Sequence, residues 1–199
     1  MVRAMRSPTT NRTRVSGLCT AFCLTMAVLT SAPVWPAEVG EPSHYKQDDY
    51  RSPVPGTLTG GTVVDTTEAQ KIWQRGDTVF IDVLPLAPKP DNLPKGTIWR
   101  EKKRDDIPGS IWLPNVGYGR LNPAMDEWYR GHLERLTGGD KDRPVLIYCL
   151  IDCWMSWNAA RRALEYGYDN VMWYPDGTDG WSFDGLPLET RTPEKFVRP

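Results

Sequence analysis

Short apolar runs that alternate with helix-like segments are the feature that most restricts the fold of this chain. These runs are long enough for strands and carry few polar residues, which is typical of strands buried on both faces of a sheet; they span residues 78–83, 144–148 and 170–174. Segments with helical spacing precede or separate these runs, and a glycine follows each segment within two residues; they span 66–75, 125–136 and 156–166. Strands that alternate with helices favour a mainly parallel sheet. We therefore predict an α/β domain with helices on both faces of a mainly parallel central sheet.

The N-terminal 37 residues have the pattern of a secretory signal peptide. Four arginines and no acidic residue precede or flank the apolar run Val15–Leu29, which is too short to span a bilayer comfortably. We predict a signal peptide over 1–37, a Pro/Gly-rich arm over 38–61, one domain over 62–188 and a C-terminal tail over 189–199. The mature protein is then expected in the periplasm, without a membrane anchor, whereas a retained anchor is the alternative.

Charge and histidine content narrow the range of partners. Loss of the signal peptide would move the formal net charge from −1 to −5, because four basic and no acidic residues leave with it, so we expect no nucleic-acid partner. His44 lies in the arm and His132 on the polar side of a helix, and neither belongs to a cluster with metal-ligand spacing. We predict neither a metal site nor a bound cofactor. The mixed-charge segment 101–106 and the tail 189–199 are interpreted as solvated.

The cysteine loop is the candidate site. Cys149 directly follows the strand that ends at Tyr148, and ligands of parallel sheets bind beyond the carboxyl ends of strands. The helix predicted from Ser156 would direct its amide N–H groups toward this loop and favour an anionic sulfur. Cys149 and Cys153 would be the only thiols after export. We predict that they are the catalytic residues. The loop predicted to cradle the sulfur anion consists of Leu150, Ile151, Asp152, Trp154, Met155 and Ser156.

Two other interpretations of these residues remain open. Cys149 could be a buried, inert thiol, because unreactive cysteines are commonly buried. Five tryptophans near the loop could form an aromatic wall for a flat ligand such as a quinone, although core packing explains them as well and is preferred; they are Trp112, Trp154, Trp157, Trp173 and Trp181.

Several consecutive segments resemble the rhodanese domain. Asp82 occupies the position of that family's aspartate at a strand end, and Ile107-Pro108-Gly109-Ser110 resembles its Ile-Pro-Gly-Ala turn. Cys149 occupies its nucleophile position, and the closing segments 167–171 and 177–181 also match. The resemblance covers residues 62–188 and implies the rhodanese-like fold. Asp82, Asp179 and Trp181 are then candidate residues supporting the loop.

The segment from Asp152 to Ala160, together with Gly177–Trp181, is similar to exported proteins called PQQ-dependent catabolism-associated CXXCW-motif proteins. That resemblance implies an association with periplasmic alcohol oxidation by quinoprotein dehydrogenases. Sulfur transfer or thiol-disulfide chemistry on a small thiol or sulfur-bearing substrate is the function we predict. The alternative is a non-catalytic binding or assembly module for the quinoprotein system.

Departures from the family restrict the chemistry. Leu150, Ile151 and Asp152 replace the polar and often basic residues of a typical sulfurtransferase loop, and the carboxylate disfavours the thiosulfate dianion. A C-x5-R phosphatase loop would place its arginine at Met155, so phosphatase chemistry is not expected.

Overall fold

A five-stranded parallel sheet organises the domain. The computed structural model describes residues 39–87, 89–90, 92–100 and 103–196, so the predicted signal peptide lies outside the described residues. The chain divides into the units Met1–Pro36 and Ala37–Pro199, and the second unit contains all the described helices and strands. The strands, in their order across the sheet, are β1 (Thr62–Val63), β6 (Val171–Tyr174), β5 (Val145–Tyr148), β2 (Val79–Asp82) and β4 (Ile111–Trp112). All four pairings are parallel, as the sequence predicted.

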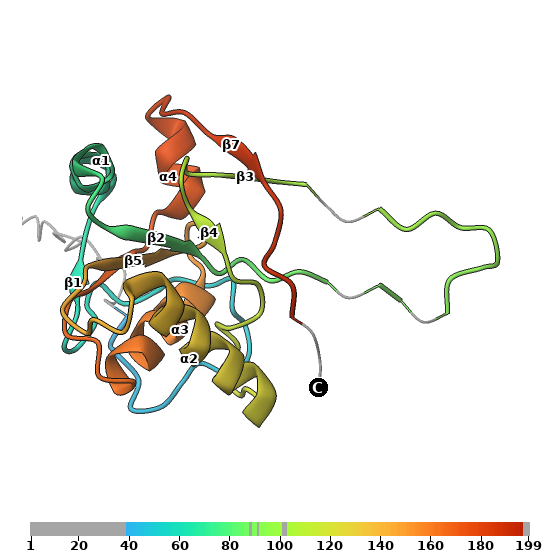
Figure 1. The fold of residues 1–199 in the computed structure, drawn as a ribbon, viewed down its shortest axis with the longest axis horizontal. Helices are drawn as coiled ribbons and strands as arrows, with labels where there is room; N and C mark the ends of the chain where they lie inside the picture. Colours follow the sequence, from blue (N-terminus) through green and yellow to red (C-terminus); the bar gives the residue numbers. More distant parts are fainter. Residues whose placement is uncertain (1–38, 88, 91, 101–102, 197–199) are drawn as a thin grey trace, which may run out of the picture. The chain divides into compact units, whose positions relative to one another are not determined.

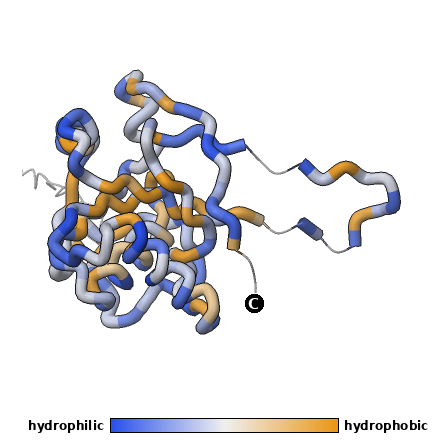
Figure 2. Tube along the Cα trace, viewed as in Figure 1, coloured by the Kyte–Doolittle hydropathy of each residue, from blue (hydrophilic) through white to orange (hydrophobic). Residues whose placement is uncertain are grey.

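Helices cover both faces of this sheet (Figure 1). The helices α2 (Pro123–Thr137) and α3 (Trp154–Glu165) lie on one face, and α1 (Thr66–Arg75) and α4 (Gly177–Phe183) lie on the other. Successive strand residues feed opposite cores: Ile147 and Trp173 pack with α3, whereas Leu146 and Tyr174 pack with α1 and α4. Figure 2 shows the apolar residues concentrated along the strands. This two-sided burial explains why the strands are continuously apolar.

The predicted helices form with small changes at their ends. Asp65 caps α1 by accepting a hydrogen bond from the amide of Glu68 at 2.8 Å, and Gly76 ends that helix at a φ of 71°. Helix α3 begins at Trp154, two residues before the predicted start, with Cys153 as its N-terminal flanking residue. The early start brings the first amides of the helix directly to the cysteine loop.

A small second sheet corrects the interpretation of the segment 101–106 as a solvated loop, whereas the part of the tail that pairs with it is largely exposed. Strand β3 (Arg104–Asp106) pairs antiparallel with β7 (Glu189–Arg191), which lies at the start of the predicted tail. Arg104 and Asp106 are buried on one side of β3, and Asp105 between them is exposed. The alternation of a strand turns two of the charges inward, where ion pairing compensates them.

The segments around the domain differ in how they pack. The described residues between β2 and β3 form neither helix nor strand, and Figure 1 shows this long loop extending away from the sheet rather than over it. The arm, described from residue 39, instead runs against α3 and contributes the buried Leu58 to the core. No helix within the described part of the chain has the length and apolar character needed to span a membrane.

Candidate functional site: a buried cysteine pair

The cysteine loop lies between the carboxyl end of β5 and the first turn of α3. Cys149 follows β5 directly, and Asp152 adopts a φ of 51° that turns the chain back toward the helix. Aspartate tolerates this left-handed conformation better than most residues. Ile151 and Asp152 are exposed at the tip of the loop, as expected for a solvated Asp152, whereas Leu150 is half-buried.

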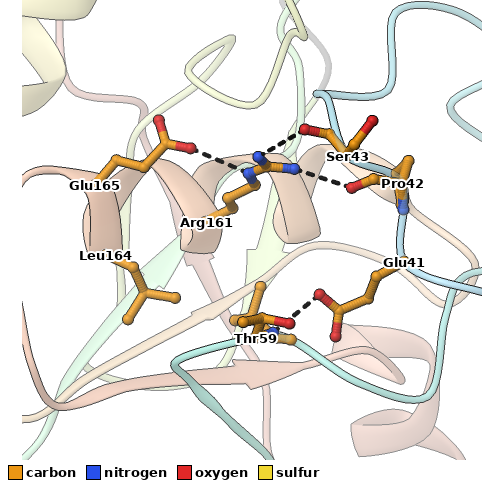
Figure 3. A pocket seen from close by; sticks show the side chains of 8 residues that line it. Glu41, Pro42, Ser43, Thr59, Arg161, Leu164 and Glu165 are labelled. Atoms are coloured by element: carbon orange, nitrogen blue, oxygen red, sulfur yellow. Dashed lines mark hydrogen bonds and ion pairs between the residues drawn. The ribbon is translucent and has the colours of Figure 1, made fainter.

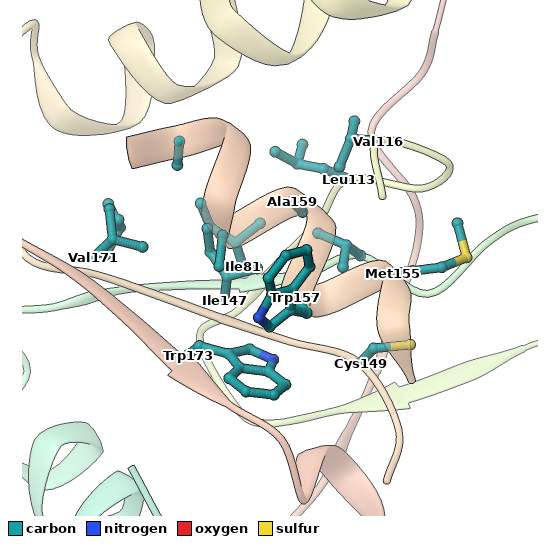
Figure 4. Close-up of a cluster of buried hydrophobic side chains, with 14 of the residues drawn as sticks. Ile81, Leu113, Val116, Ile147, Cys149, Met155, Trp157, Ala159, Val171 and Trp173 are labelled. Carbon is teal, nitrogen blue, oxygen red and sulfur yellow. The ribbon is translucent and has the colours of Figure 1, made fainter. Parts of the chain in front are cut away.

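Both thiols are buried, and each shifts the pKa of the other. Cys149 is 0% exposed and Cys153 is 2% exposed, and neither forms a disulfide. Figure 4 shows Cys149 at the end of the core cluster, next to the first turn of α3. The hydrogen bond between the sulfurs means that one thiol donates to the other. The pair therefore functions as a single unit that can hold one proton and one negative charge.

The two sulfurs have opposite electrostatic environments. Burial raises the pKa of Cys149 well above its ordinary value, and the neighbouring Cys153 and Asp82 raise it further. The hydrogen bond from Cys149 lowers the pKa of Cys153 to about 6, against the opposing effect of burial, and the amides of Met155 and Leu150 also lower it. Of the two thiols, Cys153 is the one whose surroundings favour the thiolate, whereas the sequence assigned the nucleophile to Cys149, which stays a prediction. The cause is geometric, since Cys153 is the residue that adjoins the first turn of α3.

The backbone of Cys149 is held from two sides. The amide of Thr178 at the start of α4 donates to the Cys149 carbonyl at 3.1 Å, and Arg104 Nη2 donates to the same oxygen at 3.3 Å. Gly177 packs so closely that an added Cβ would lie 2.4 Å from that oxygen, and its φ is 54°. Asp179 accepts a hydrogen bond from the amide of Ile151 at 3.0 Å. The segment 177–179 thus fixes the loop, and Asp179 has the supporting position that the sequence predicted.

A buried polar network lies behind the loop. Arg104 Nε donates to Asp82 Oδ2 at 2.7 Å and lies 3.6 Å from Asp106 Oδ1, with both carboxylates fully buried. The Tyr148 hydroxyl lies 2.9 Å from Asp106 Oδ1 and 2.7 Å from Ser110 Oγ. Burial, followed by the charge of Asp82, raises the pKa of Asp106 to about 8. The Tyr148 hydroxyl donates to the Asp106 carboxyl, and its contact with Ser110 links the network to the turn before β4.

The remaining predicted residues have structural roles. Ser156 Oγ donates to the Cys153 carbonyl at 2.8 Å and accepts from Trp173 Nε1 at 2.9 Å, which ties the first turn of α3 to β6. Trp181 packs in the core on the opposite face of the sheet, edge-on to Trp73, and does not reach the thiols. The five tryptophans of the suggested aromatic wall are all buried, so core packing accounts for them.

Sequence reasoning missed Arg104, Asp106 and Gly177 as parts of the site. The sequence carried no signal for the two charged residues, because three adjacent charges in Arg104-Asp105-Asp106 suggest a solvated loop. Their buried–exposed–buried alternation is seen only in the structure. Among the described residues no cluster of histidine, cysteine or acidic side chains has the arrangement of a metal site.

Comparison with known proteins agrees with the resemblance noted in the sequence. Thiosulfate sulfurtransferase GlpE of Actinobacillus pleuropneumoniae serotype 5b (strain L20) is 35% identical over 78 residues, which are 39% of this chain. The same enzyme from serotype 3 (strain JL03) matches equally. The matched part is 58% of these relatives' length.

Two solved structures are similar in chain trace. The polysulfide-sulfur transferase of Wolinella succinogenes is 20% identical, covers 66% of this chain and 80% of its own, and has a TM-score of 0.41. YnjE is 23% identical, covers 67% of this chain and 32% of its own, and has a TM-score of 0.48. The model of the rhodanese-like domain matches residues 65–184, well over half of the sequence. This chain therefore belongs to the rhodanese-like domain family.

Proposed function

We propose that this protein carries sulfane sulfur on its cysteine pair and passes it between small thiols. The observation that carries the proposal is the position of two buried thiols at the carboxyl edge of the sheet, with Cys153 at the first turn of α3. These surroundings lower the pKa of Cys153 to about 6. A thiol with such a pKa is largely ionised at neutral pH, and the thiolate is the nucleophilic form of cysteine.

The transfer we propose has two steps without net oxidation. The Cys153 thiolate attacks the outer sulfur of a persulfide R–S–S–H; the S–S bond of the donor breaks, and R–S⁻ leaves. Cys153 then holds the outer sulfur as a persulfide, Cys153–S–S–H. An acceptor thiolate attacks that same sulfur, which forms the acceptor persulfide and returns Cys153 as a thiolate. Cys149, with its raised pKa, keeps its proton and donates a hydrogen bond to the Cys153 sulfur throughout.

A branch of this cycle uses both cysteines. Cys149 can attack the inner sulfur of the Cys153 persulfide, which releases hydrogen sulfide and leaves a Cys149–Cys153 disulfide. The two protons of the sulfide come from the Cys149 thiol and from the persulfide. An external dithiol must then reduce the disulfide, so this branch is thiol-disulfide chemistry and requires that second substrate.

The charge at the loop tip favours a donor of low charge. Asp152 is exposed at the tip, and the loop itself supplies no cation to offset it. A carboxylate near the entrance disfavours a dianion such as thiosulfate more strongly than a singly charged or neutral persulfide. The curated relatives are named thiosulfate sulfurtransferases, and we propose that this chain differs from them in its donor.

We further propose that the protein works in the periplasm in association with PQQ-dependent alcohol catabolism. The signal-like pattern of residues 1–37 and the similarity to the CXXCW-motif proteins support this assignment. Detection of the processed protein in a periplasmic fraction would test the location.

Burial of both sulfurs favours a second candidate function. With exposures of 0% and 2%, the pair could serve only the packing of a non-catalytic module that binds a partner of the quinoprotein system. Persulfide turnover distinguishes the two candidates.

The test uses purified protein, a low-molecular-weight persulfide and an excess of acceptor thiol. We expect the protein to accelerate formation of the acceptor persulfide, Cys153→Ser to abolish the acceleration, and Cys149→Ser to reduce it. Circular dichroism checks that each variant is folded. Failure of the folded wild-type protein to accelerate transfer would refute the sulfur-carrier proposal and leave the binding module.

A further inference from the structure

The N-terminal arm is fastened along the whole length of α3. Asn158 Oδ1 accepts from the backbone amide of Lys46 at 3.0 Å, and Asn158 Nδ2 donates to the Lys46 carbonyl at 2.9 Å. Near the C-terminal end of the helix, Arg161 donates to the carbonyls of Pro42 and Ser43, each at 3.0 Å (Figure 3). These hydrogen bonds are made to backbone groups of the arm, and they fix the register of the arm on the helix.

The arm then crosses the first turn of α3, directly beside the cysteine pair. The amide of Trp154 donates to the carbonyl of Tyr50 at 3.0 Å, and Trp154 Nε1 lies 3.1 Å from both Ser52 Oγ and the Pro53 carbonyl. The Tyr50 hydroxyl accepts from the amide of Gly119 at 3.0 Å. Residues 50–52 are thus held on both sides of Arg51, and Trp154 is the residue that follows Cys153.

Backbone strain marks both facing segments. Asp49 in the arm has a φ of 42°, and Asp152 in the cysteine loop has a φ of 51°. Non-glycine residues at positive φ cost free energy and concentrate at functional sites. The crossing is therefore a specified arrangement rather than a loose terminal segment.

Arg51 brings a positive charge to a loop that has none of its own. Its side chain belongs to an exposed residue, whereas the loop tip carries Ile151 and the acidic Asp152. The two neighbours of Arg51 are anchored to Trp154, and the charge of Arg51 is the last of the causes that lower the pKa of the adjacent Cys153 thiol. A cation at this place can also meet an incoming anion before it reaches the sulfur.

We propose that Arg51 of the arm is the substrate-receiving cation of the cysteine site and gives it a preference for a singly charged sulfur anion over a neutral compound. This inference rests on the proposed function, because it names the class of donor that Cys153 accepts. A persulfide R–S–S–H whose R group carries one carboxylate fits the class: one guanidinium matches its charge, and Asp152 opposes a second negative charge.

Two alkylating reagents that differ in charge test the role of Arg51. Iodoacetate is an anion and iodoacetamide is neutral, and both lose iodide to a thiolate. The rate of modification of Cys153 is measured by peptide mass spectrometry at pH 8, where a thiol with a pKa of about 6 stays ionised even after a moderate shift. The readout is the ratio of the iodoacetate rate to the iodoacetamide rate.

We expect Arg51→Gln to lower this ratio about three- to tenfold, which is the range for one partly screened charge, and high salt to shrink the difference. Arg51→Lys should keep most of the ratio. Arg75→Gln is the matched control, because Arg75 is exposed at the end of α1, which leads into the opposite, amino end of β2. An unchanged ratio in Arg51→Gln, an equal change in Arg75→Gln, or no alkylation of the native protein by either reagent would overturn the proposal.

This assay separates the inference from the function beneath it. Alkylation requires no sulfur transfer, so a lowered ratio without persulfide turnover would support Arg51 as an anion-receiving residue and refute the sulfur carrier. Turnover with an unchanged ratio would refute only the role of Arg51.

Discussion

The hydrogen bond between the two thiols makes a quantitative prediction about Cys149→Ala. This substitution removes the donor that contributes most to the lowered pKa of Cys153, while the amides of Met155 and Leu150 remain. A hydrogen bond to a charged group contributes about 1.5–3 kcal/mol, and one pKa unit corresponds to about 1.4 kcal/mol. We therefore expect the pKa of Cys153 to rise from about 6 by roughly one to two units.

The assay is the pH dependence of thiolate ultraviolet absorbance, together with the rate of alkylation by iodoacetamide. The inflection point is the decisive quantity, because a thiolate with a higher pKa is also a better nucleophile and partly compensates in rate. Cys149→Ser retains a hydroxyl donor and should shift the inflection less than Cys149→Ala. An inflection near 9 in the wild-type protein, or one that Cys149→Ala leaves in place, would refute the assignment of the anion to Cys153.

Three further predictions concern the network and turn that hold the loop. Arg104→Gln leaves Asp82 buried without its ion pair, so we expect the free energy of unfolding, measured with urea, to fall by about 3–5 kcal/mol. The exposed Arg75→Gln should lower it by only about 0–1 kcal/mol, and equal losses in the two variants would contradict the reasoning. The pKa of Asp106 is about 8 in the folded protein against 3.8 for an ordinary carboxyl, so the folded protein binds more protons between these values and loses stability as pH rises through that window. The free energy of unfolding of Asp106→Asn should therefore rise relative to that of the wild type between pH 4 and pH 8. A difference that stays constant with pH would contradict this. Gly177→Ala places a Cβ against the Cys149 carbonyl at a positive φ, so we expect at least about 1–3 kcal/mol of destabilisation and faster amide exchange in residues 149–153. A melting temperature equal to that of the wild type would show that the contact is not tight.

The sequence predicted the central sheet because its strands are buried on both faces. Such strands must be apolar at every position, so the runs ending at Tyr148 and Tyr174 are visible without any structure. Helix α1 was equally predictable from its capping residues and Gly76. By contrast, the short helix α4 begins Gly177-Thr178-Asp179-Gly180, residue types that favour turns, and only its packing against the cysteine loop and α1 makes it helical.

The site was predictable in its location but not in its electrostatics. A cysteine that follows a parallel strand and precedes a helix indicates where an anion can be held, and the structure puts both cysteines between the end of β5 and the start of α3. Which of two nearby sulfurs carries the charge depends on burial and on the direction of a few amide groups, which residue types do not encode. The arm left no signal for a related reason: Tyr50 reaches α3 through its backbone carbonyl, and any residue has one.

In the proposed cycle, Cys153 is the sulfur that receives and carries sulfane sulfur. The most direct measurement treats the native protein with a small persulfide, blocks the products with an alkylating reagent, and maps by peptide mass spectrometry which cysteine has gained one sulfur atom. We expect the extra sulfur on Cys153, both in the wild-type protein and in Cys149→Ser. Extra sulfur on Cys149, or on neither cysteine of the folded protein, would contradict it.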